Sequence, residues 1–169
     1  MRKTIFAAAA AAMYLAAVPF AAAMDVTPDM KSLKWGPAPP SLPPGAQVAV
    51  ISGDPSKDGP YVIRAKLPAR YTVPPHTHPT DENVTVLVGS FHFAMGDKLD
   101  KKKGTLIKSG GFFRAEKGMQ HYAWTDRGTT IQVHGQGPFV INYVNPADDP
   151  QNKPMAKAMP PKTPGSDKK

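Results

Sequence analysis

Short runs of β-branched and aromatic residues, each followed by glycine, proline or aspartate, fill the sequence from about residue 46 to residue 144. Runs of this length and composition are typical of strands, and their close spacing leaves no room for long helices. We therefore predict an all-β chain folded as a single jelly-roll β-barrel. The predicted strands are 47–52, 61–67, 71–73, 84–89, 91–95, 105–108, 112–115, 121–125, 130–134 and 140–144.

The composition excludes several other classes of protein. The chain has 169 residues, a length that fits one domain, and its hydrophobic content of 41% is too high for a fully disordered protein. Because cysteine is absent, the chain can form neither a disulfide framework nor a thiolate metal site. Any metal ion must therefore be held by His, Asp or Glu.

The N-terminus has the layout of a secretory signal peptide. Two basic residues precede an uncharged, alanine-rich stretch over residues 5–23 that ends in small residues. We predict that residues 1–23 are removed and that the mature protein, starting at Met24, is periplasmic or secreted. An uncleaved membrane anchor is the alternative, because about 20 apolar residues can span a bilayer, but Pro19 and the weak hydrophobicity favour cleavage.

Shifts in composition mark three further segments. Residues 24–45 contain a Pro-rich stretch that suits neither a helix nor a central strand, so we predict an extended arm. Residues 46–145 form the predicted barrel, and residues 146–169 are a Pro- and Lys-rich tail with too few apolar side chains to order it. The part of the arm over residues 33–45 could pack on a second copy of the chain, so a homodimer is one expectation.

The positive charge does not predict a nucleic-acid partner. Loss of the two basic residues of the signal peptide lowers the formal net charge from +8 to +6. The one dense cluster, Lys98 and residues 101–103, is interspersed with Asp97 and Asp100 and lacks the aromatic residues on which bases stack. We interpret it as a solvated turn, and we expect no nucleic acid and, after signal cleavage, no membrane as partner.

The histidines carry the chemistry. His76 and His78 are two residues apart, so on a strand both imidazoles point to one face. Glu82 follows after a turn, in register with the alternating valines over residues 84–88, which indicates that this face looks into the barrel. Two imidazoles and a carboxylate in an apolar interior are costly unless they are paired or coordinate an ion.

At this point the sequence resembles the cupin superfamily. The first cupin motif, Gly-x5-His-x-His-x3–4-Glu-x6-Gly, is matched by His76, His78, Glu82 and Gly89 with every internal spacing kept. Its leading glycine is replaced by Arg70, a departure at a turn and not at a ligand.

The second cupin motif, Gly-x5-Pro-x-Gly-x2-His-x3-Asn, is matched by Gly110, Gly118 and His121. Glu116 stands where proline is usual and Thr125 where asparagine is usual. Two motifs with their spacings kept are far more specific than one.

The resemblance implies a small barrel with His76, His78, Glu82 and His121 around one divalent transition metal. Imidazole and carboxylate ligands suit Zn, Mn, Cu, Fe or Ni, and four ligands leave positions open for water or substrate. Export before folding would mean metal loading outside the cytoplasm, where Zn, Mn or Cu are favoured over Fe(II).

Other residues are second-rank candidates. His134 and Gln132 alternate with apolar neighbours, so they are either surface residues or one polar wall of the pocket, and in the second case they are candidate catalytic residues. His92 is expected to face outward, between two phenylalanines that face the core. Tyr122 and Trp124 are expected to pack between the sheets.

The functional hypothesis is an exported, metal-dependent cupin oxidoreductase, dioxygenase-like, that acts on a small organic molecule while an uncoordinated pocket group moves protons. The alternative is a non-catalytic metal- or ligand-binding module of the cell envelope. A metal-free sugar-binding cupin is a third interpretation, which retention of all four ligands disfavours. The fold by itself identifies no substrate.

Overall fold

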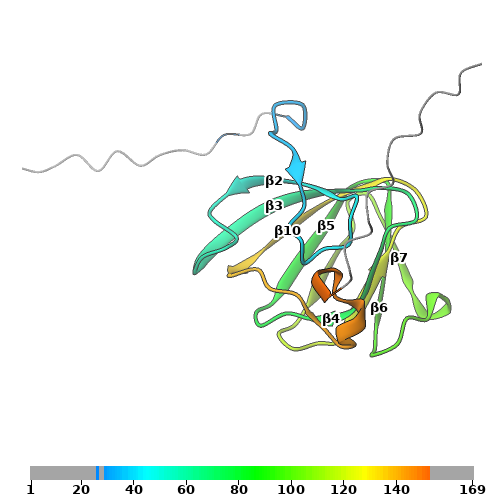
Figure 1. The fold of residues 1–169 in the computed structure, drawn as a ribbon. Helices are drawn as coiled ribbons and strands as arrows, with labels where there is room; N and C mark the ends of the chain where they lie inside the picture. The colour runs from blue at the N-terminus through cyan, green and yellow to red at the C-terminus, as the bar shows by residue number, and fades with distance from the viewer. Residues whose placement is uncertain (1–25, 27–28, 153–169) are drawn as a thin grey trace, which may run out of the picture.

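Two antiparallel β-sheets enclose the core of the protein (Figure 1). The structure is a computed structural model that describes residue 26 and residues 29–152. The predicted signal peptide, residues 1–23, and residues 153–169 of the predicted tail lie outside the described residues. Among the described residues there is no α-helix, and no helix is long and apolar enough to cross a membrane. The predicted all-β fold is confirmed.

The larger sheet has six strands in the order β1-β2-β3-β10-β5-β8. These are β1 (Gly36–Pro37), β2 (Gln47–Ser52), β3 (Gly59–Leu67), β10 (Thr129–Gly137), β5 (Glu82–Val88) and β8 (Phe112–Ala115). The smaller sheet has five strands in the order β11-β4-β9-β6-β7. These are β11 (Asn142–Tyr143), β4 (Thr72–Thr77), β9 (His121–Trp124), β6 (Ser90–Met95) and β7 (Thr105–Lys108).

Most strands lie where the sequence predicts them, and β2, β7 and β8 coincide with the predicted ranges to the residue. The predicted strand over residues 140–144 shortens to β11, because the Val140 carbonyl accepts a hydrogen bond from the His78 side chain instead of a strand partner. The predicted strand over 71–73 continues to Thr77 as β4, although it contains two prolines.

Alternating residues of both sheets form the core. Glu82, Val84 and Val86 are buried and lie on one face of β5, as the alternation predicts, whereas Val88 at the end of the strand is exposed. The buried apolar residues around them are Ala46, Tyr61, Ile63, Ala65, Leu67, Tyr71, Val73, Phe91, Ala123, Ile131 and Val133. This interior is the space into which the candidate site opens.

The Pro-rich arm packs on the barrel of its own chain. β1 is the edge strand of the larger sheet, a position where the missing N–H of proline is tolerated, and it pairs with β2. Two phenols hold the segment that follows: Tyr71 Oη donates to the Pro43 carbonyl at 2.6 Å, and Tyr143 Oη donates to the Ser41 carbonyl at 2.8 Å. Leu42, between these two anchors, packs against the core.

Tyr122 and Trp124 do not pack between the sheets, so that expectation is wrong. They form a separate buried cluster with Ala94, because the alternation along β9 directs His121 into the barrel and its neighbours to the outer face. The turn over residues 96–104 covers this cluster. Tyr122 Oη donates to the backbone carbonyl of Asp100 at 2.9 Å.

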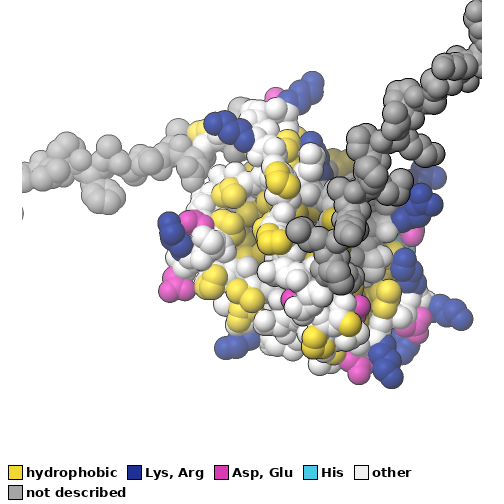
Figure 2. Space-filling model, in the orientation of Figure 1, with side chains coloured by type: hydrophobic (Ala, Val, Ile, Leu, Met, Phe, Trp, Pro, Cys, Tyr) yellow, Lys and Arg dark blue, Asp and Glu magenta, His cyan; other side chains and the backbone are white. Residues whose placement is uncertain are grey.

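The lysine cluster lies in this exposed turn, as predicted. The short 3-10 helix η1 (Lys101–Lys103) is capped by Asp100, whose carboxylate accepts a hydrogen bond from the Lys102 backbone N–H at 3.0 Å. In the face shown in Figure 2, Lys and Arg side chains lie around the rim with Asp and Glu side chains among them. This mixture is that of a solvated surface.

The predicted disordered tail is ordered over its first seven residues, 146–152, so the prediction is wrong for this part. These residues form two 3-10 helices, η2 (Pro146–Asp148) and η3 (Pro150–Asn152). The Asn145 side chain accepts from the Ala147 backbone N–H at 3.1 Å, and Asp149 accepts from that of Gln151 at 2.9 Å. Local side-chain caps thus supply hydrogen bonds that composition alone does not reveal.

Candidate metal centre

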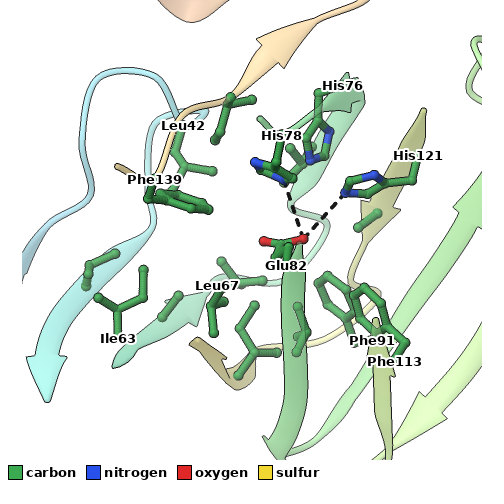
Figure 3. A pocket seen from close by; sticks show the side chains of 18 residues that line it. Leu42, Ile63, Leu67, His76, His78, Glu82, Phe91, Phe113, His121 and Phe139 are labelled. Atoms are coloured by element: carbon green, nitrogen blue, oxygen red, sulfur yellow. Dashed lines mark ion pairs between the residues drawn. The ribbon is translucent and has the colours of Figure 1, made fainter. Parts of the chain in front are cut away.

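Three histidines converge at one end of the barrel interior (Figure 3). His76 lies in β4, His78 directly after it, and His121 is the first residue of β9. His76 and His121 are paired across the two neighbouring strands. One nitrogen of each ring lies within 4.8 Å of the other two, and all three residues are buried. The three residues are thus close enough to hold one ion.

An irregularity in β4 aims the first two imidazoles. The pairing of β4 with β9 shifts register between Val73 and His76, where Pro74 and Pro75 intervene. A strand alternates strictly, so without this bulge Val73 and His76 would face opposite sides of the sheet. With it, Val73, His76 and His78 all line the same interior.

Backbone carbonyls fix the tautomer of each imidazole. The Nδ1 atoms of His76, His78 and His121 lie 2.7, 2.7 and 2.9 Å from the carbonyl oxygens of Pro74, Val140 and Met119, respectively. A carbonyl only accepts, so each neutral ring carries its proton on Nδ1 and presents the lone pair of Nε2 to the interior. This arrangement is typical of imidazoles that bind a metal through Nε2.

Glu82 faces these lone pairs from the other sheet. Its Oε2 lies 3.5 Å from Nε2 of His78 and 3.5 Å from Nε2 of His121, as the dashed lines in Figure 3 show. With Nδ1 protonated, neither Nε2 has a hydrogen to donate to the carboxylate, and both are buried without a hydrogen-bond partner. With the rings neutral, acceptors thus face acceptors, an arrangement that a proton or a metal ion between them would satisfy.

The electrostatics of the site favour the ionised carboxylate of Glu82 and the neutral imidazole of His76, the forms that bind a metal ion. Burial raises the pKa of the Glu82 carboxyl, but His78 and His121 outweigh this effect and hold the pKa well below its usual range. Burial, reinforced by the neighbouring imidazoles, lowers the pKa of His76 to about 3. Burial also opposes the charged form of His78, but Glu82 and the Val140 carbonyl together raise its pKa.

These residues fit a divalent transition metal. The donor set is three imidazole nitrogens and one carboxylate oxygen, which suits Zn, Mn, Fe, Ni or Cu. Coordination of a metal ion would satisfy the buried, unpartnered Nε2 atoms of His78 and His121. The predicted group of His76, His78, Glu82 and His121 is therefore brought together by the fold.

The cavity beside the site has a volume of about 50 Å³, and its other walls are apolar. Apart from the three histidines and Glu82, its lining residues are Leu42, Val48, Ile63, Ala65, Leu67, Val73, Val84, Phe91, Phe113, Ala123, Ile131, Val133, Phe139 and Ile141. The polar side chains therefore lie at one pole of an otherwise hydrocarbon pocket.

The second-rank candidates lie elsewhere. Gln132 and His134 alternate with Ile131 and Val133, which line the cavity, so they face the outer side of the sheet. Gln132 accepts a hydrogen bond from Arg64 Nε at 3.1 Å on that side. The structure does not bring these two residues into the pocket.

His92 faces outward, as predicted. It stacks on Trp124 with ring centroids 4.7 Å apart, and its Nε2 lies 2.8 Å from the Asp126 carboxylate. Asp81 contacts no imidazole either. It accepts from the Lys117 backbone N–H at 2.8 Å and so fixes the loop that leads to His121.

The departures from the cupin motifs have structural consequences. Arg70, in place of the motif glycine, adopts a positive φ of 61°, a conformation that glycine adopts without strain. Thr125, in place of asparagine, is buried, accepts from the Tyr71 backbone N–H at 3.2 Å and donates to the Pro68 carbonyl at 2.7 Å. Thr125 thus ties down the turn that contains Arg70.

Sequence reasoning missed three walls of the pocket. Leu42 comes from the arm, and Phe139 and Ile141 come from the segment between β10 and β11. Phe139 stacks on His78 with ring centroids 5.3 Å apart. No sequence signal marks these residues, because their partners lie far away in the chain.

Comparison with known proteins gives one family and several structures. The family model described as "Domain of unknown function (DUF4437)" matches residues 11–142. No curated protein matches the sequence.

Three solved structures illustrate the shared fold. The polyketide cyclase RemF from Streptomyces resistomycificus is 16% identical, with a TM-score of 0.58 over 75% of this chain and 90% of the other. A proposed acetylacetone dioxygenase from Methylibium petroleiphilum is 14% identical, with a TM-score of 0.58 over 76% and 87%. An RmlC-like cupin from Shewanella frigidimarina is 11% identical, with a TM-score of 0.50 over 64% and 86%.

Proposed function

Because this chain belongs to the DUF4437 family and is a cupin, with the jelly-roll fold and the histidine group that its sequence predicts, we propose that it is an exported metalloenzyme. In this proposal it holds one divalent transition metal and performs oxygen- or metal-assisted chemistry on a small organic molecule. Two solved structures of the same fold carry the names of enzymes that act on organic molecules, which fits this class.

One observation carries the proposal: three imidazoles, each fixed by a backbone carbonyl, converge at one pole of a buried pocket, where Nε2 of His78 and Nε2 of His121 face the Glu82 carboxylate. A purely structural cluster would be expected to satisfy its own hydrogen bonds. Here Nε2 of His78 and of His121 have no hydrogen-bond partner, and they face the cavity.

A bound ion would supply Lewis-acid or redox chemistry at this pole of the pocket. His76, His78 and His121 would hold it, with Glu82 as the fourth ligand. The apolar walls exclude bulk water and so strengthen every electrostatic interaction at the pole. Among the described residues, no ionisable side chain other than these four lines the cavity, so the pocket offers no uncoordinated side chain that could move a proton.

Export is a proposal that rests on residues 1–23, which have the layout of a signal peptide. N-terminal sequencing of protein secreted from the full-length gene tests it. A mature N-terminus at Met24 in the periplasm or medium is the expected result, and an intact Met1 in a membrane pellet would mean that the segment is an anchor.

The metal proposal is tested by elemental analysis of the purified protein beside two variants. Glu82→Gln keeps the size of the side chain but removes its charge, and we expect it to retain less metal than the wild-type chain. His92→Ala, on the outer face, is the matched control and is expected to keep about one ion per chain. A well-folded wild-type protein without metal after reconstitution would refute the proposal.

A non-catalytic module that binds a metal or a small ligand is the second candidate. The small cavity, and the absence from its lining of any polar group besides the four site residues, favour this alternative. Oxygen consumption with a panel of small apolar substrates separates the two candidates. Turnover that His121→Ala abolishes identifies an enzyme, whereas tight metal uptake without exchangeable water identifies a binding module.

A further inference from the structure

We propose that the ligand of this pocket has one oxygen-bearing head, which faces the histidines, and a short, uncharged hydrocarbon body. This inference rests on the proposed function, because the head requires the metal site. It adds the chemical class of the ligand, which neither the fold nor the family description assigns.

The distribution of polar atoms in the pocket carries the inference. Of the 18 side chains that line it, only His76, His78, Glu82 and His121 can form a hydrogen bond, and these four meet at one pole (Figure 3). Within the part of the chain that the structure describes, no lysine, arginine, serine, threonine, tyrosine or amide side chain lines the pocket. A ligand can therefore make polar side-chain contacts in this pocket only at its head.

The polar groups of the surrounding strands point away. In β3, Ile63 and Ala65 line the pocket, whereas Arg64 and Lys66 between and after them face the outer side of the sheet. Lys66 Nζ lies 4.0 Å above the Trp35 ring there. Tyr61 is the exception: it shares the inner face of β3 with Ile63 and is buried in the core, in the row of Glu82 across Gly135, but it does not line the cavity.

This apolar lining disfavours a ligand whose body carries polar groups. A hydroxyl or amide that enters an apolar environment without a partner loses its hydrogen bonds to water, and a charged group loses far more. Sugars, phosphates and amino acids carry several such groups. A short alkyl or alkenyl body instead gains from burial against Ile63, Val84 and Val133.

The volume limits the size of the body. A cavity of about 50 Å³ has room for on the order of four water molecules. A metal ion at the pole and the head of the ligand would occupy part of this space. The body that fits without movement of the walls is therefore short.

Two isosteric probes test the inference. Butanohydroxamate and 3-hydroxypropanohydroxamate share a metal-binding head and differ only in a terminal methyl or hydroxyl group. Calorimetric titration of the zinc-loaded full chain measures both. We expect the hydroxyl probe to bind about 10-fold more weakly or worse, because its hydroxyl is buried without a partner. Equal affinities, or tighter binding of the hydroxyl probe, would overturn the inference.

A pair of variants tests whether the preference for butanohydroxamate over the hydroxyl probe arises in the pocket. Val133→Thr puts a hydroxyl on the pocket wall at nearly constant size and is expected to reduce the preference to about 3-fold or less. Val62→Thr makes the same change on the outer face of the neighbouring strand and is expected to leave the preference unchanged. A preference that Val62→Thr alters and Val133→Thr does not would mean that the probes bind elsewhere.

Metal analysis of the same samples distinguishes failure of the proposed metal site from failure of the inference about the ligand. If the chain takes up none of the divalent transition metals, the proposed function fails, and xenon then probes the cavity without metal, because apolar cavities bind it. Xenon-induced methyl shifts at Ile63, Val84 and Val133 would support a hydrocarbon-binding pocket. Absence of these shifts would overturn the inference independently of the metal.

Discussion

Replacement of His121 by leucine is expected to affect the metal-free and the metal-loaded protein differently. His121 is 2% exposed and of similar size to leucine, so the substitution leaves no large cavity. Its Nδ1 lies 2.9 Å from the Met119 carbonyl, while its Nε2 is buried without a hydrogen-bond partner. The imidazole is therefore half satisfied until a metal binds.

Without metal the change should cost little. Loss of the hydrogen bond to Met119 costs about 1 kcal/mol, whereas removal of an unpartnered buried nitrogen returns about 1–3 kcal/mol. Glu82 keeps His78 as its neighbour at 3.5 Å. We expect the free energy of unfolding of the metal-free variant to lie within about 1 kcal/mol of that of the wild-type protein.

With metal the difference should be large. Free zinc at 100 times its dissociation constant stabilises a folded protein that binds it at one site by about 2.7 kcal/mol. For a domain of this size, this corresponds to a rise in Tm of roughly 10 °C. His121→Leu removes one of the ligands, so we expect almost none of this stabilisation in the variant at the same zinc concentration.

Urea unfolding in EDTA and in buffered zinc measures both quantities, with His92→Leu as the outer-face control. His92→Leu should keep the full zinc-dependent stabilisation. If His121→Leu responds to zinc as the wild-type protein does, His121 is not a ligand. If the variant loses more than about 3 kcal/mol in EDTA, the nitrogen has a partner in the metal-free protein and the reasoning fails.

Three further predictions concern the scaffold. Arg70→Gly should raise the free energy of unfolding by about 0.5–1 kcal/mol in urea titrations, because a φ of 61° strains the arginine backbone. A loss of stability would mean that the Arg70 side chain has a role of its own. Thr125→Val should lower the free energy of unfolding by about 2 kcal/mol without changing the metal content, because the two hydrogen bonds to the Pro68–Tyr71 turn are lost. A loss below about 0.5 kcal/mol would contradict the role of Thr125 in holding this turn. Burial raises the pKa of Tyr71, so this phenol ionises in the unfolded chain before it ionises in the folded protein. The free energy of unfolding is therefore unaffected below a pH of about 10 and should fall as the pH rises further. Tyr71→Phe should reduce this fall in alkaline urea titrations, and an unchanged dependence of the unfolding free energy on pH would contradict the prediction.

The strands and the ligand set were predictable because they depend on local patterns. Alternation with period two placed Glu82, Val84 and Val86 on one buried face of β5. The spacing of His76, His78 and His121 within two motifs indicated the metal group that the fold brings together. The alternation is read within a few residues of chain, whereas the ligand set came from the resemblance of two short, separate motifs to those of cupins.

The orientation of other strand residues could not be read locally. Alternation shows that His134 and Gln132 share a face, but it does not say which face looks inward. The neighbours of β10 decide this, because Ile131 and Val133 pack against β3 and β5 inside the barrel. The same limit applies to Tyr122 and Trp124, whose outer face is buried only because a distant turn covers it.

The sequence by itself therefore determined the class of fold, most of the strand positions and the four residues that meet at the site. Only the tertiary structure decided the character of the pocket. Its walls come from Leu42 of the arm, Phe139 beyond β10 and apolar faces of both sheets. These contacts join residues far apart in the chain, and packing in three dimensions, not local propensity, selects them.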